Sequence, residues 1–131
     1  MNKRAHCIIF NNDKGFLILL KKKEKKGIYH QILSGGVENE ESFIETIIRE
    51  IKEEINITIS KDRLELLFKE NNRAFYYLNV NNLEVNNLRL SNEHIGYGFV
   101  KNINLVPELT INQSAGEVSE ILKKIITTKF I

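Results

Sequence analysis

The segment from Gly35 to Ile57 constrains this chain more than any other, because it predicts a helix with one apolar stripe. Ser42 is suited to cap the start of that helix, and Asn56 to end it, since Asn tolerates the left-handed conformation common at helix ends. The apolar residues recur at helical spacing, at Phe43, Ile44, Ile47, Ile48, Ile51 and Ile55.

Three carboxylates, Glu50, Glu53 and Glu54, converge near the end of the same helix. Like charges three or four residues apart repel each other, and the negative end of the helix dipole disfavours them further. We expect this charged cluster on the side opposite the apolar stripe, with the pKa of at least one carboxyl raised. Oxygen ligands in this arrangement indicate a site for a hard divalent cation.

Strand-like runs surround the helix. The runs His6–Phe10 and Phe16–Lys22, separated by turn-forming residues 11–15, predict a hairpin, and a second hairpin is predicted from Leu64–Lys69 and Arg73–Val80. A strand at Ile28–Leu33 is expected to lead into a turn at residues 34–36. Gly96–Lys101 predicts a further strand, Gly116–Thr128 a closing amphipathic helix, and Asn81–Asn92 irregular or edge structure.

These elements predict an α/β fold, with a mixed sheet and two helices layered in one domain over residues 1–131. The composition agrees, since 42% of the residues are hydrophobic and 27% are charged. Cys7 lies in an apolar run and predicts a buried, inert thiol. In the absence of a signal peptide or a membrane-length apolar stretch, a cytoplasmic protein is the default expectation.

The net charge of +2 is too small to indicate a nucleic-acid partner. The lysine run at positions 21–26 is the local exception, and it is either a solvated strand end or a place where anionic substrate is attracted. Basic and aromatic residues are not interleaved there as single-strand binding would require.

The same segment resembles the Nudix box. That pattern has a Gly, five residues, a Glu, seven residues, Arg-Glu, an aliphatic residue, any residue, Glu-Glu, any residue, Gly and an aliphatic residue. This chain departs from the pattern only at the second Gly, where Asn56 stands. The matching residues are Gly35, Glu41, Arg49, Glu50, Ile51, Glu53, Glu54 and Ile57. The resemblance implies a Nudix fold, in which helices sandwich a mixed β-sheet.

A second, shorter resemblance lies downstream. Glu93-His94-Ile95-Gly96-Tyr97 is similar to a Glu-His-two-residues-Tyr segment of MutT-like enzymes that hydrolyse dATP and dihydroneopterin triphosphate. In that group the Glu is the proposed base. The resemblance therefore implies that Glu93 is the base for an attacking water or an additional metal ligand.

The Nudix resemblance also implies roles within the box. Glu50, Glu53 and Glu54 would bind Mg²⁺, or Mn²⁺, and Glu53, Glu54 and Glu93 would be the catalytic residues. Gly35 and Gly36 would form a phosphate-binding loop. Glu41 and Arg49 would pair with each other to tie that loop to the helix.

The implied activity is Mg²⁺-dependent hydrolysis of a nucleoside triphosphate or a related diphosphate-linked compound. Water would attack phosphorus and release pyrophosphate and a monophosphate. A dinucleoside polyphosphate or nucleotide-sugar hydrolase is an alternative with the same metal site, and a non-catalytic nucleotide sensor is an alternative of another class. The partner is in each case a nucleotide-like small molecule, and a homodimer is an option that the sequence leaves open.

Overall fold

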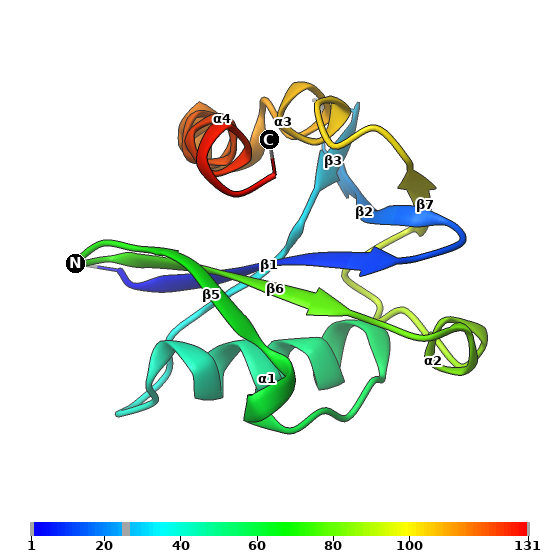
Figure 1. Cartoon of the computed structure of the whole chain (residues 1–131), viewed down its shortest axis with the longest axis horizontal. Coiled ribbons are helices and arrows are strands. Elements are labelled where there is room, and N and C mark those ends of the chain that lie inside the picture. Colours follow the sequence, from blue (N-terminus) through cyan, green and yellow to red (C-terminus); the bar gives the residue numbers. More distant parts are fainter. Residues whose placement is uncertain (1, 25–26, 131) are drawn as a thin grey trace.

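One mixed seven-stranded sheet lies between helices on both of its faces (Figure 1). The computed structural model describes residues 2–24 and 27–130. The strand order is β3-β2-β1-β6-β5, with β4 also paired to β1 and β7 to β2. β1 and β6 run parallel, and the other pairs are antiparallel. The strands are β1 (Arg4–Asn11), β2 (Gly15–Lys23), β3 (Gly27–Gln31), β4 (Leu33–Gly36), β5 (Glu65–Lys69), β6 (Arg73–Asn79) and β7 (Gly96–Val100).

Two longer helices cover the sheet. α1 (Phe43–Ile55) packs on one face and α4 (Glu117–Lys129) on the other, so the predicted α/β architecture with a sandwiched sheet is confirmed (Figure 1). The shorter helices are α2 (Asn82–Asn86) and α3 (Leu105–Leu109), and two 3₁₀ turns are η1 (Lys61–Arg63) and η2 (Gln113–Gly116). Among the described residues, no helix has both the length and the apolar composition needed to cross a membrane.

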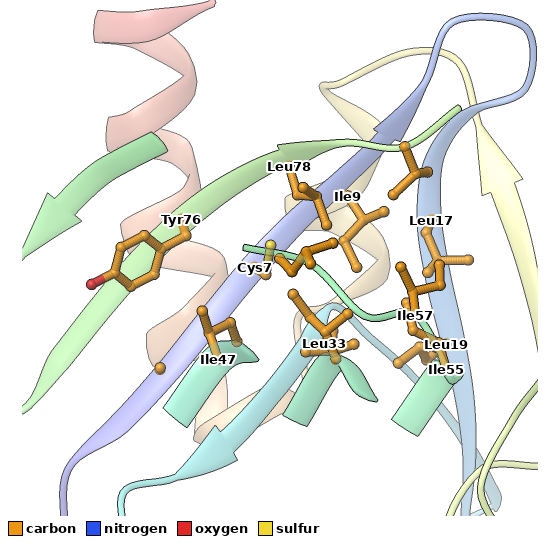
Figure 2. Close-up of a cluster of buried hydrophobic side chains, with 14 of the residues drawn as sticks. Cys7, Ile9, Leu17, Leu19, Leu33, Ile47, Ile55, Ile57, Tyr76 and Leu78 are labelled. Carbon is orange, nitrogen blue, oxygen red and sulfur yellow. The ribbon is translucent and has the colours of Figure 1, made fainter. Parts of the chain in front are cut away.

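The strands alternate their side chains between two cores. In β1, Cys7 and Ile9 contribute to the core beneath α1, whereas Ile8 contributes to the core beneath α4. Figure 2 shows the first of these, where strand residues meet Ile47 and Ile55 of α1. Burial raises the pKa of the Cys7 thiol well above its ordinary value, which confirms a buried and unreactive thiol.

The hairpin between β1 and β2 is closed by Asn11 and Gly15. The Asn11 side chain accepts hydrogen bonds from the backbone N–H groups of Asp13 and Lys14, each at 3.0 Å. Gly15 has a φ of 103°, and a Cβ there would lie 2.3 Å from the Val100 carbonyl oxygen. Only glycine fits this close approach to the end of β7.

The ends of α1 match the sequence prediction. The Ser42 hydroxyl accepts from the backbone N–H of Glu45, and the Glu45 carboxylate accepts from the backbone N–H of Ser42. Asn56 ends the helix in the left-handed conformation, at φ 62° and ψ 36°. The helix that carries the carboxylates is therefore fixed at both ends by its own sequence.

The prediction of one strand at Ile28–Leu33 followed by a turn was wrong. The chain leaves β3 at Gln31 and enters β4 at Leu33, and Ser34, Gly35 and Gly36 belong to β4. β3 pairs with β2, whereas β4 pairs with β1. The break is stabilised from a distance, because the Gln113 side chain bonds both the N–H and the carbonyl of Ile32, each at 3.0 Å.

The prediction of irregular structure throughout Asn81–Asn92 was also wrong in part. Asn81 caps the short helix α2 through the backbone N–H of Glu84, and the Glu84 carboxylate accepts in return from Asn81. Arg63 holds the same carboxylate at 2.7 Å. The sequence prediction missed this capping box because asparagines recur throughout the segment.

Candidate active site

The three box carboxylates of α1 lie in different environments. Glu50 and Glu54 are buried, with 9% and 4% of their surface exposed, and only Glu53 is exposed. The expectation that all three lie on the side opposite the apolar stripe was therefore wrong for Glu50 and Glu54. They flank that stripe because α1 packs against β4 on one side and against the segment 89–95 on the other.

Gly35 creates the space that Glu50 occupies. A Cβ on Gly35 would lie 2.0 Å from the Glu50 carboxyl carbon, so any side chain here would displace that carboxylate. Gly36 is not restricted in this way, since the nearest atom to a Cβ there is an Arg4 nitrogen at 3.7 Å. Neither glycine is among the residues with positive φ. Gly35 is thus required for the close approach of helix and strand, not for a turn.

Arg49 connects the strand end, the preceding loop and the helix. Its Nε and Nη2 donate to the Glu41 carboxylate at 2.7 and 2.9 Å, so the ion pair expected from the sequence is present in bidentate form. Nη2 also donates to the Gly36 carbonyl at 3.0 Å. Nη1 donates to Glu50 at 2.9 Å and to Glu53 at 3.2 Å. The Arg49 bonds to Glu41, together with a bond from the Glu38 backbone N–H, lower the pKa of Glu41 to about 2.

The segment 89–95 brings two further groups to the carboxylates. The N–H groups of Arg89 and Ser91 donate to the carbonyls of Ile55 and Glu54, at 3.1 and 3.0 Å, and so satisfy the end of α1. Ile95 N–H donates to Leu20 of β2 at 2.8 Å. Anchored at both ends, the segment places Glu93 and His94 beside Glu54, although they are distant in sequence.

Glu54 is the most perturbed of these groups. Burial, together with the charges of Glu93 and Glu50, raises the pKa of Glu54 to about 7, and a hydrogen bond with Glu93 adds to the rise. Burial also raises the pKa of Glu50. His94 Nδ1 lies 2.7 Å from Glu54 Oε2, without the alignment of a hydrogen bond, and burial lowers the His94 pKa. The expected pKa rise is confirmed, and burial is a larger cause than crowding.

The donor set fits a hard divalent cation by its chemistry. Glu50, Glu54 and Glu93 are crowded carboxylates whose mutual repulsion a bound cation would relieve. Within residues 2–24 and 27–130, however, no three acidic, His or Cys side chains already form a metal-binding group. Glu50 and Glu53 are engaged by Arg49. The carboxylates are thus adjacent, and Arg49 bonds two of them, Glu50 and Glu53.

A cleft of about 340 Å³ opens beside Glu93 and His94. Three cations, Arg4, Lys21 and Lys23, also line it, and we call them the cationic wall. The lysine run drew attention to part of this wall, but Lys25 and Lys26 lie outside the described residues. No sequence signal indicated Arg4, or the polar groups of Ser34 and Gln113 that also line the cleft.

A larger cleft, of about 580 Å³, lies beside the start of α4 and is lined by residues such as Arg73, Ile111 and Glu117. Neither cleft is lined by Glu50, Glu53 or Glu54, but only the smaller of the two is lined by Glu93 and His94, which lie beside Glu54. Size alone therefore does not locate the site, and the chemistry of the smaller cleft is the better guide.

The sequence matches the NUDIX domain over residues 1–123. The chain belongs to the Nudix hydrolase family. Members of this family act on compounds that contain a nucleoside diphosphate, and they generally use divalent metal cations. No curated protein matches the sequence.

Several solved structures share this Nudix fold. An Ap4A hydrolase from C. elegans is 26% identical, with a TM-score of 0.64 and coverage of 95% of this chain and 96% of the other. The E. coli dihydroneopterin triphosphate pyrophosphohydrolase is 18% identical, with a TM-score of 0.64 and coverage of 95% and 92%. A MutT/nudix family protein from Enterococcus faecalis is longer. It is 18% identical, with a TM-score of 0.61 and coverage of 73% of this chain and 42% of the other.

The raised pKa of Glu54 predicts how the stability of this Nudix domain depends on pH without metal. Between pH 4.5 and 7 the folded state retains a proton on Glu54 that the unfolded state has lost, so this group makes folding less favourable as pH rises. Glu54→Gln removes that penalty. In EDTA at pH 8 we expect the variant to be about 1–3 kcal/mol more stable than the wild type, and about equally stable at pH 4.5.

Urea unfolding of both proteins across this pH range measures the difference in free energy. Titrating groups that do not interact with Glu54 cancel between the two proteins. A difference that stays constant from pH 4.5 to 8 would show that Glu54 titrates normally in the folded state.

Proposed function

We propose that this Nudix domain hydrolyses a nucleoside triphosphate or a related diphosphate-linked compound, with Mg²⁺ as cofactor and Mn²⁺ as a substitute. Water attacks a phosphorus atom, the bridging P–O bond breaks, and pyrophosphate and a monophosphate leave. The observation that carries the proposal is the pair of buried carboxylates, Glu50 and Glu54, with the exposed Glu93 beside them at the edge of a cleft with a cationic wall.

The carboxylates have separable roles in this proposal. Glu50, Glu53 and Glu54 would hold the cation, which when bound neutralises phosphate oxygens and polarises the bond to the leaving group. Glu93 lines the cleft and accepts the proton from the attacking water. Arg49 would hold Glu50 and Glu53 in position, supported by its bidentate bond to Glu41. Gly35 leaves the room that Glu50 needs next to the strand.

A dinucleoside polyphosphate is a second candidate substrate. The similarity to the C. elegans Ap4A hydrolase extends over nearly the whole length of both chains and favours it. Both substrates share the same phosphorus chemistry and differ in the number of phosphates. A pure nucleotide sensor is less favoured, because binding alone does not require buried carboxylates with a raised pKa.

Incubation of the purified protein with nucleoside triphosphates, diadenosine polyphosphates and nucleotide sugars tests the proposal. Each reaction is run with Mg²⁺ and with EDTA, and the phosphate-containing products are identified. We expect turnover only with Mg²⁺, with pyrophosphate and a monophosphate as the products from triphosphates. Tight nucleotide binding with no product from any substrate would contradict hydrolysis and favour the sensor.

A further inference from the structure

Groups of opposite charge line the cleft beside Glu93. Glu93 and His94 line it next to Glu54 of α1, and Arg4, Lys21 and Lys23, the cationic wall, line it as well. Lys21 is close enough to His94 for its charge to lower the His94 pKa, after the larger effect of burial. A ligand in this cleft can thus contact the cations while it lies beside the carboxylates.

The cations are placed by the strands. Residues two apart in a strand lie on one face, so Lys21 and Lys23 of β2 point to the same side and Lys22 to the opposite side. Tyr29 is the β3 partner of Lys21, and the Lys23 ammonium lies 4.9 Å from the centre of the Tyr29 ring. This contact orients Lys23 without neutralising its charge.

Arg4 is placed from the other branch of the sheet. Its Nη2 donates to the Ser34 hydroxyl at 3.2 Å, and Gln113 Nε2 donates to the same hydroxyl at 3.3 Å. Ser34 and Gln113 lie where β4 separates from β3, so Arg4 is held at the point where the sheet divides. The guanidinium retains further donors that can bind phosphate oxygens.

The cationic wall lacks the ion pairs that other cations in the described part of the chain make. Across the part of the chain that the structure describes, none of Arg4, Lys21 and Lys23 forms an ion pair, whereas other cations such as Arg49 and Arg63 do. Unpaired cations that share a cleft repel one another, and an anion with several charges relieves that repulsion. A neutral sugar carries no charge and does not relieve the repulsion.

We propose that Arg4, Lys21 and Lys23 form an anion subsite that selects substrates with three or more consecutive phosphates over diphosphate-linked sugars. This inference rests on the proposed hydrolysis for its effect on catalysis. Each further phosphate adds negative charge, so a chain of three or more phosphates is attracted to these three cations more strongly than a diphosphate is. The subsite therefore discriminates by the number of phosphates and not by the base.

Binding of inorganic phosphates tests the subsite independently of hydrolysis. Titration calorimetry in EDTA compares tripolyphosphate with pyrophosphate on the wild type, on the Lys21→Gln/Lys23→Gln double variant and on Lys22→Gln. We expect tripolyphosphate to bind the wild type about tenfold more tightly than pyrophosphate, and the double variant to lose this preference. Lys22→Gln, with the same charge change on the opposite face of β2, should retain it. Equal loss in both variants, or no preference in the wild type, would overturn the subsite.

Kinetics test the selection itself. For the double variant we expect kcat/KM to fall about 10–100-fold with ATP and diadenosine tetraphosphate, chiefly through KM, and less than about threefold with ADP-ribose. Circular dichroism of both variants checks that the fold is retained. Equal losses for all three substrates would overturn the selection while leaving hydrolysis intact. No Mg²⁺-dependent turnover by the wild type would instead reject the proposed hydrolysis, and the calorimetry would still decide the subsite.

Discussion

Glu54→Gln is expected to lower Mg²⁺-stimulated turnover about 10²–10³-fold while leaving the fold intact. The Glu54 carboxylate lies close to those of Glu50 and Glu93. Replacing it with a neutral amide removes a negatively charged ligand from the proposed cation site. Steady-state kcat with saturating Mg²⁺ measures the effect. Glu53→Gln carries the same expectation, because the proposal assigns Glu53 to the cation as well.

Glu120→Gln is the matched control, because it makes the same change on an exposed face of α4 and is expected to leave kcat unchanged. Circular dichroism excludes unfolding as the cause of any loss. Undiminished turnover in both Glu54→Gln and Glu53→Gln would contradict the metal assignment.

Gly35→Ala is expected to reduce kcat about 100-fold, since a displacement of roughly 1 Å at a catalytic site has that effect. The added Cβ would come within 2.0 Å of the Glu50 carboxyl carbon, so this carboxylate has to move away from its position between β4 and Arg49. Overpacking should also cost about 1–3 kcal/mol of stability. Activity and thermal unfolding of the variant measure the two effects separately.

Gly36→Ala provides a close control. It adds the same methyl group one residue later, where the nearest atom is 3.7 Å away and the environment is half-buried. We expect its kcat to remain within about threefold of the wild type, because an ordinary van der Waals contact moves nothing. A Gly35→Ala protein as active as Gly36→Ala would show that the position of Glu50 does not matter for turnover.

The local features of this domain could be predicted from sequence, because adjacent residues determine them. Ser42 and Glu45 form the capping box of α1, and Asn56 ends the helix with its own backbone conformation. The turn chemistry of Asn11 likewise depends on a few neighbouring residues. The box spacing then located the carboxylates on one helix.

The features that could not be predicted from sequence depend on contacts between residues far apart in the chain. The division between β3 and β4 relies on the Gln113 side chain, which bonds Ile32 across 81 positions in the sequence. The burial of Glu50 depends on the approach of Gly35, and nothing within α1 reveals it. The cationic wall combines Arg4 with lysines of β2 only because the sheet brings them together. Such groupings require the three-dimensional structure.

Calorimetric titration of Mg²⁺ into the wild type and Glu54→Gln, at pH 6.5 in two buffers with different ionisation enthalpies, tests the central claim most directly. A cation that binds the carboxylate group must displace the proton that Glu54 retains below its pKa of about 7. We expect saturable binding with release of about one proton in the wild type, and much weaker binding without proton release in the variant. Equal Mg²⁺ affinity in both proteins, with no proton released, would contradict a metal site at Glu54.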